Sequence, residues 1–133
     1  MNKNYWRLLA TVAMVLVASF GSVTADEVET TTLNGAYIWA QGNADGELEV
    51  IFTPTGEAEW DVAFNFTFRN KPHTYSGSAI GELGEGAFSG TVMNESKKRT
   101  FTFEGSFEDG VFMGTHAEVH GEKSSSTGTL TFK

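Results

Sequence analysis

The stretch GSFEDGVFMGT, residues 105–115, predicts a tight β-hairpin that carries a glycine on each arm. Its Asp-Gly pair at 109–110 is the favoured chemistry for a two-residue turn that requires positive φ angles. A turn at this pair sets two cross-strand neighbours on one face: Phe107 with Phe112, and Gly105 with Gly114. The hairpin therefore places a large apolar pair beside the turn and a glycine pair one step further along.

The stretch GELGEGAFSGT, residues 81–91, repeats this spacing 24 positions earlier. A turn at Glu85-Gly86 would set two similar pairs: Leu83 with Phe88, and Gly81 with Gly90. Paired glycines let a sheet curl sharply and leave space for neighbouring rings, which helps a sheet to close on itself. Gly77 and Gly128 fall on the same core face. We therefore interpret the repeat as a barrel-closing device rather than a phosphate loop, because a phosphate loop leads into a helix.

Two-residue alternation is clearest in AEWDVAFNFTFR, residues 58–69, where one face is apolar and the other almost entirely polar. This period is typical of a half-buried strand, and no helical spacing occurs after residue 25. The same pattern predicts seven further strands: Ala36–Gln41, Glu47–Thr53, Thr74–Leu83, Ala87–Met93, Arg99–Glu108, Val111–Val119 and Thr127–Phe132. Short connections favour antiparallel neighbours. We expect an all-β fold, a small antiparallel up-and-down barrel of about eight strands, with a β-sandwich as the alternative.

This arrangement resembles the lipocalin and avidin group of up-and-down barrels over residues 35–133. Lipocalins carry a Gly-x-Trp motif at the first strand, whereas this chain has Gly35-Ala-Tyr37 there and its tryptophan at Trp39. No binding residue is carried over from either family. The resemblance implies a barrel that could hold one small apolar molecule.

The first 25 residues have the three parts of a secretory signal peptide. Lys3 and Arg7 lie in a short polar start, an uncharged run covers residues 8–20, and small residues precede the expected cleavage after Ala25. The uncharged run is short for a membrane span, which needs roughly 18 residues or more. We therefore expect export to the periplasm or the extracellular space, a flexible lead at residues 26–34, and a single barrel domain at residues 35–133.

Cleavage would leave 7 Lys and Arg residues against 17 Asp and Glu residues, a formal charge of −10. This acidity argues against nucleic acid and anionic membrane surfaces as partners, because phosphate binding needs clustered positive charge. The chain has no cysteine, so no disulfide supports the fold.

In an up-and-down barrel the connections alternate between two ends. We call the end with the connections GNADG, NKPH, NESKK and HGEKSSS the wide end. It gathers six cations, which are Arg69, Lys71, Lys97, Lys98, Arg99 and Lys123, whereas the other end holds Glu57, Glu82, Glu85, Glu108 and Asp109. A positive rim around an aromatic interior would suit an amphipathic anion, but charged residues also collect in solvated loops by default.

The segment HAEVH, residues 116–120, should point His116, Glu118 and His120 inward near the wide end. Carboxylate and imidazole groups can bind Zn²⁺, with His73 as a further ligand, so these residues are the candidate metal ligands, but titratable residues at a strand end are common without a metal and we expect none here. The alternatives are an ion pair between Glu118 and Arg99, and a bulge that exposes the three side chains. The candidate rim residues for ligand binding are His73, Arg99, His116, Glu118 and His120.

An eight-stranded interior is just wide enough for side chains to fill, so we expect a mostly filled core with any cavity at the wide end. No catalytic arrangement is recognisable, and we expect neither enzymatic activity nor a cofactor. The sequence favours a carrier or sensor for a small apolar or amphipathic molecule. The alternative is a structural or interaction module that docks on another exported protein.

Overall fold

The computed structural model describes residues 29–41 and 44–133. The expected signal peptide and the first part of the expected lead lie outside these residues. The described residues form eight strands. None of them belongs to a helix with the length and hydrophobicity that a membrane span requires. The strands are β2 (Thr31–Trp39), β3 (Ala44–Gly56), β4 (Glu59–Phe68), β5 (Lys71–Glu82), β6 (Glu85–Asn94), β7 (Arg99–Glu108), β8 (Val111–His120) and β9 (Lys123–Phe132).

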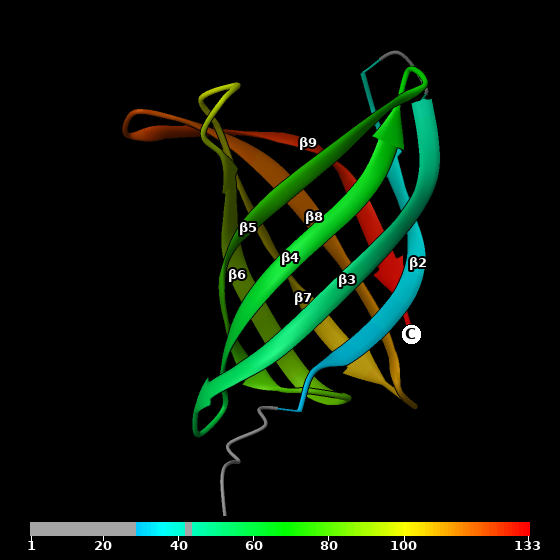
Figure 1. The fold of residues 1–133 in the computed structure, drawn as a ribbon, viewed down its shortest axis with the longest axis vertical. Coiled ribbons are helices and arrows are strands. Elements are labelled where there is room, and N and C mark those ends of the chain that lie inside the picture. The colour runs from blue at the N-terminus through cyan, green and yellow to red at the C-terminus, as the bar shows by residue number, and fades with distance from the viewer. Residues whose placement is uncertain (1–28, 42–43) are drawn as a thin grey trace, which may run out of the picture.

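Each strand pairs antiparallel with the next in the chain, and β9 pairs with β2 to close the barrel (Figure 1). The closing seam is short, with five residue pairs from Gly35–Phe132 to Trp39–Gly128. The predicted up-and-down barrel is therefore confirmed, and the sandwich alternative is wrong.

The strands reach further than the sequence suggested. β2 begins at Thr31, so residues 31–34 pair with β3 and belong to the barrel rather than to the flexible lead. β9 begins at Lys123 and takes up most of the expected HGEKSSS loop. β5 begins at Lys71 and includes Pro72. The pairing of β5 with β6 starts only at Ser76. The proline, which lacks an N–H, therefore removes no hydrogen bond to β6.

The hairpin at 105–115 has the predicted register, with Phe107 opposite Phe112 and Gly105 opposite Gly114. The two glycines let the backbones approach closely, because a Cβ on Gly105 would lie 2.3 Å from Met113 O and 2.5 Å from Gly114 Cα. A Cβ on Gly114 would lie 2.7 Å from the Phe112 ring. The pair therefore provides both the close approach and the space for rings that the sequence indicated.

The prediction for the hairpin at 81–91 was wrong. Its turn is Leu83-Gly84, between paired Glu82 and Glu85, and a register shift at Gly81/Glu82 puts Gly81 opposite Phe88. Gly90 consequently faces Ala79 on β5 and Phe103 on β7. The observed turn thus lies two residues before the predicted Glu85-Gly86 turn.

The end of the barrel opposite the wide end is filled by aromatic rings. Phe52, Phe88, Phe112 and Phe132 are each no more than 2% exposed. Phe112 stacks on Phe132 with ring centroids 4.5 Å apart, and Phe88 meets Phe52 edge to face at 5.6 Å. Such contacts add to the burial energy of the rings and fix their orientation.

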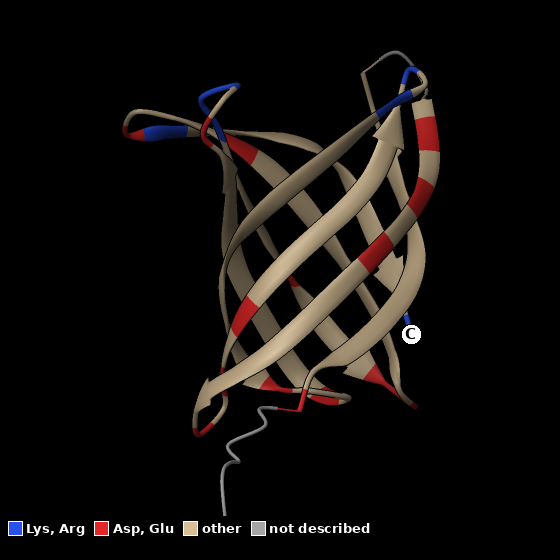
Figure 2. Ribbon diagram, viewed as in Figure 1, with Lys and Arg blue, Asp and Glu red and all other residues tan. Residues whose placement is uncertain are grey.

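The two ends differ in charge, as Figure 2 shows. Among the described residues, every Lys and Arg except Lys133 lies on the connections and strand ends of the wide end. Asp45, Glu95 and Glu122 also lie there, so this rim is mixed in charge rather than uniformly positive. The acidic residues expected at the other end do flank its three turns.

Candidate functional site

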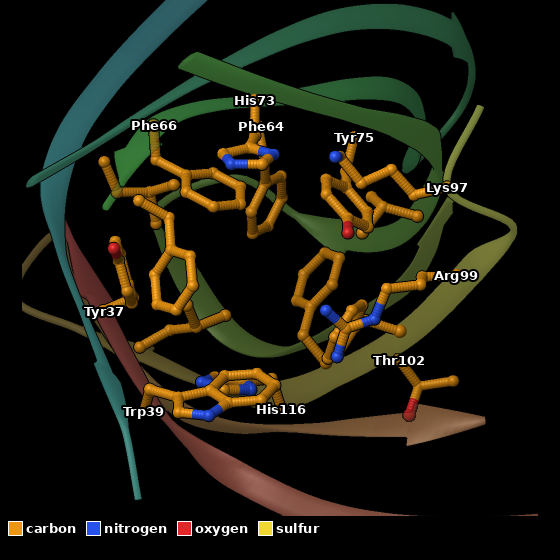
Figure 3. A pocket seen from close by; sticks show the side chains of 16 residues that line it. Tyr37, Trp39, Phe64, Phe66, His73, Tyr75, Lys97, Arg99, Thr102 and His116 are labelled. Atoms are coloured by element: carbon orange, nitrogen blue, oxygen red, sulfur yellow. The ribbon is translucent and has the colours of Figure 1, made fainter. Parts of the chain in front are cut away.

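A cavity of about 110 Å³ opens inside the wide end of the barrel (Figure 3). Most of its wall is apolar, and aromatic rings from β2, β4, β5 and β7 dominate it. The lining residues are Tyr37, Trp39, Leu48, Phe64, Phe66, Phe68, His73, Tyr75, Val92, Lys97, Arg99, Phe101, Thr102, Phe103, His116 and Leu130. The cavity thus lies where the sequence placed any open space in the core.

The rings hold one another in place around the cavity. The Trp39 ring meets Phe101 edge to face at 5.8 Å, and Phe101 meets Tyr75 in the same way at 5.6 Å. Tyr75 stacks on Phe66, whose ring also meets Tyr37 at 5.2 Å. Edge-to-face and offset contacts favour particular ring orientations, so the aromatic residues that line the cavity form an ordered apolar surface.

Arg99 and Glu118 form a two-point ion pair at the mouth. Arg99 Nε and Nη2 each donate to a Glu118 carboxylate oxygen at 2.8 Å. This bond lowers the pKa of Glu118 and raises that of Arg99. The guanidinium carbon lies 5.6 Å from the centre of the Trp39 ring and 5.2 Å from that of Phe101. The ion pair is thus the one given as an alternative from the sequence, and the structure adds that it fixes Arg99 over the aromatic wall.

His116 is buried, and both of its ring nitrogens are engaged. Nε2 donates to the Ile38 carbonyl at 3.0 Å, and Nδ1 lies 2.6 Å from the Thr127 hydroxyl. Burial lowers the pKa of His116, and the bond to Ile38 opposes this shift only in part. The imidazole is therefore neutral at pH 7 with its proton on Nε2, and the Thr127 hydroxyl that lies against Nδ1 donates to the His116 backbone carbonyl at 3.0 Å. The ring stacks on Trp39 with centroids 5.8 Å apart (Figure 3).

The structure divides the five candidate rim residues. His73, Arg99 and His116 line the cavity, with His73 stacked on Phe66 at 5.5 Å. Glu118 does not line the cavity, but it accepts a hydrogen bond from Arg99, which does. The His120 side chain is 62% exposed, and its Nε2 lies 3.7 Å from Glu118.

The metal-ligand candidates His116, Glu118 and His120 do not form a metal site. The β8–β9 bulge falls at Thr127 on β9, so His116 still faces Phe103 and Glu118 still faces Phe101, as the register predicted. However, the His116 nitrogens bond to Ile38 and Thr127, and Glu118 bonds to Arg99. Within the described part of the chain, no group of three or more His, Cys, Asp or Glu side chains could hold a metal ion.

Sequence reasoning missed the aromatic residues that matter most in the wall. Tyr37 and Trp39 on β2, and Tyr75 on β5, line the cavity. The signal was present, because strict alternation along each strand places all three on the inner face. The rim candidates predicted from the sequence were charged or imidazole side chains instead. Of the six expected rim cations, Lys97 and Arg99 line the cavity, whereas Arg69, Lys71, Lys98 and Lys123 do not.

No protein family model matches the chain, and no curated protein matches it significantly. The likeness to lipocalins and avidins is therefore one of architecture.

Proposed function

We propose that this protein is an exported, non-enzymatic binding protein that holds a small apolar or amphipathic molecule in the wide-end cavity. The observation that carries the proposal is the contrast between the two halves of one core. At the end opposite the wide end, aromatic rings fill the barrel and are almost completely buried. At the wide end, aromatic rings surround about 110 Å³ of open space. A core that served packing alone would gain stability by filling that space.

The dimensions support a ligand with a small apolar body. Eight-stranded barrels have an interior that either fills with side chains or holds one small ligand. An engineered apolar cavity of about 150 Å³ takes up benzene, so about 110 Å³ suits roughly one ring or a short chain. The remainder of such a molecule would lie in the mouth beside Lys97 and Arg99.

The polar groups of the wall support binding rather than catalysis. His116 lines the cavity, but both of its ring nitrogens contact Ile38 and Thr127, so neither is placed to act as a general base on a bound molecule. His73 stacks flat on Phe66 at the rim.

The proposal is tested by following the melting temperature, Tm, with and without toluene. Binding to the folded state alone raises Tm, by about 5 °C at ten times Kd for a domain of this size. Val92→Phe directs a ring into the cavity and should abolish the shift, whereas Thr91→Phe places the same ring on the outer face and should preserve it. Tm values that do not respond to toluene would contradict the proposal and favour a module that docks on another exported protein.

A further inference from the structure

The Tyr75 hydroxyl has no partner within the barrel. Tyr75 is 5% exposed, yet none of residues 29–41 and 44–133 forms a hydrogen bond with its hydroxyl. The other tyrosine of the cavity, Tyr37, donates to Thr67 O at 3.0 Å. Buried polar groups are almost always hydrogen-bonded, so the exception at Tyr75 needs an explanation. Figure 3 shows the Tyr75 hydroxyl pointing into the cavity.

Arg99 presents a second set of donors to the same space. Its Nε and Nη2 bond to Glu118, and within the described residues its Nη1 donates to no protein group. Contact with Glu118 and with the rings of Trp39 and Phe101 fixes the guanidinium. Tyr75 and the Arg99 guanidinium pack against the same ring, Phe101, at 5.6 Å and 5.2 Å from its centre, so both donors lie at one part of the cavity. Burial raises the pKa of Tyr75, so its hydroxyl remains a donor at neutral pH.

We propose that Tyr75 and Arg99 bind the carboxylate of the ligand, which makes the ligand class a small monocarboxylate with an aryl or short alkyl body. The inference rests on the proposed function, since it assigns the polar end of a molecule held in that cavity. Two convergent donors call for an acceptor with two oxygens, and an arginine edge matches a carboxylate in geometry. Glu118 compensates the charge of Arg99, and Lys97 supplies the additional positive charge at the mouth.

The position of these donors decides the orientation of the ligand. Tyr75 and Arg99 both pack against Phe101, and Phe103 follows Phe101 on the inner face of β7, further from the wide end. A carboxylate at this level leaves the apolar body to fill the space below it, where the lining is aliphatic and aromatic. The apolar walls also exclude water, which strengthens the charge-assisted bonds.

The test compares three probes by calorimetric titration of the full protein. These are toluene, phenylacetate and phenylacetamide, the last being close in shape to phenylacetate but uncharged. We expect phenylacetate to bind at least about tenfold more tightly than phenylacetamide. Tyr75→Phe, which removes only the hydroxyl, should weaken phenylacetate by about tenfold or more. A purely structural role of Tyr75 would instead weaken toluene and phenylacetate alike.

The outcomes separate this inference from the proposed function. If toluene binds but phenylacetate does not bind more tightly than phenylacetamide, the carboxylate assignment is wrong and the cavity remains a binding site. An unchanged affinity of Tyr75→Phe for phenylacetate would also overturn the assignment. If no probe binds the wild-type protein, the proposed function itself fails. A second variant, Arg99→Lys, keeps the charge but loses the planar guanidinium edge, and it should weaken phenylacetate selectively.

Discussion

His116 on β8 lies across Gly128 on β9, and this contact lets the imidazole reach the next strand of the barrel. A Cβ on Gly128 would lie 2.7 Å from His116 Nε2 and 1.8 Å from Ile38 O, the two atoms joined by the hydrogen bond that crosses this position. The seam between β9 and β2 has five residue pairs, and His116 adds a side-chain bond beside it. Trp39 stacks on the imidazole, and both rings line the cavity. Trp39 and His116 thus contribute both to the closure of the barrel and to the wall of the cavity.

The first prediction concerns Gly128. Gly128→Ala would set a methyl group against backbone and imidazole at a φ of 155°, where side chains are rarely found. We expect the variant to lose about 3 kcal/mol or more of unfolding free energy, measured by urea titration. Gly56→Ala is the matched control, because its Cβ would meet only the flexible end of Glu59 at 3.2 Å, and it should change stability by less than about 1 kcal/mol. Equal losses in both variants would show that the His116 crossing does not depend on Gly128.

The second prediction concerns pH. Burial holds the pKa of His116 below its ordinary value of 6.5, so the unfolded chain binds a proton that the folded barrel resists. This contribution to stability is complete above about pH 6.5 and declines as the pH falls from there through the folded-state pKa. Glu118 also has a lowered pKa, but its contribution is lost only below its ordinary value of 4.5. The window from pH 6.5 to 5 therefore reports on His116 rather than on Glu118.

His116→Gln should be less stable than the wild type at pH 7.5, by about 1–3 kcal/mol, and should lose less stability on going to pH 5. His120→Gln is the control, since that side chain is mostly exposed. Urea unfolding at pH 7.5, 6.5, 5.8 and 5.0 measures each slope. A His116→Gln slope as steep as that of the wild type would rule out His116 as its source.

The third prediction contrasts the two halves of the core. Phe112→Ala removes a fully buried ring that stacks on Phe132, and it should cost about 3–5 kcal/mol. Phe66→Ala removes a half-buried ring of the cavity wall, and it should cost about 1–2 kcal/mol. It should also admit bulkier aromatic probes than toluene. Equal costs, measured by urea unfolding, would mean that the wide end is packed as tightly as the other end.

The fourth prediction concerns the ion pair. Glu118→Gln keeps an acceptor for Arg99 but removes the negative charge that compensates it. Phenylacetate should then bind several-fold more tightly, whereas toluene should be unaffected, because only the anion gains from the released positive charge. Lys98→Glu serves as the control, since Lys98 does not line the cavity, and it should change phenylacetate affinity much less than Lys97→Glu. Weaker phenylacetate binding by Glu118→Gln would count against an anion beside Arg99.

The strands and one hairpin register could be predicted because both depend on local signals. Alternation along residues 58–69 and the Asp109-Gly110 turn need no information from distant residues. The register of the hairpin at 81–91 could not be predicted, because Leu83-Gly84 and Glu85-Gly86 are similar turn candidates. Contacts beside β4 contribute to deciding which of the two pairs forms the turn. Gly81 N donates to Ala58 O, and the Trp60 indole donates to Gly81 O.

The site was predictable in its location but not in its chemistry. Sequence placed His116, Glu118 and Arg99 near one end, and the register gave the ion pair as an alternative. The bond from His116 to Ile38 joins residues 78 positions apart and depends on Gly128 lying between them, which no local pattern indicates. That no described residue hydrogen-bonds the Tyr75 hydroxyl likewise appears only in the folded structure. The loop charges were a poor guide to the site, because four of the six predicted rim cations do not line the cavity.

The central claim is that the wide-end cavity admits a small molecule. Nuclear Overhauser spectroscopy of the labelled protein with toluene tests this claim directly. We expect cross-peaks from toluene protons to Trp39, Val92 and Phe101, which line the cavity from three different strands. Cross-peaks confined to exposed outer side chains such as Met93 and Met113, or no cross-peaks at all, would contradict it.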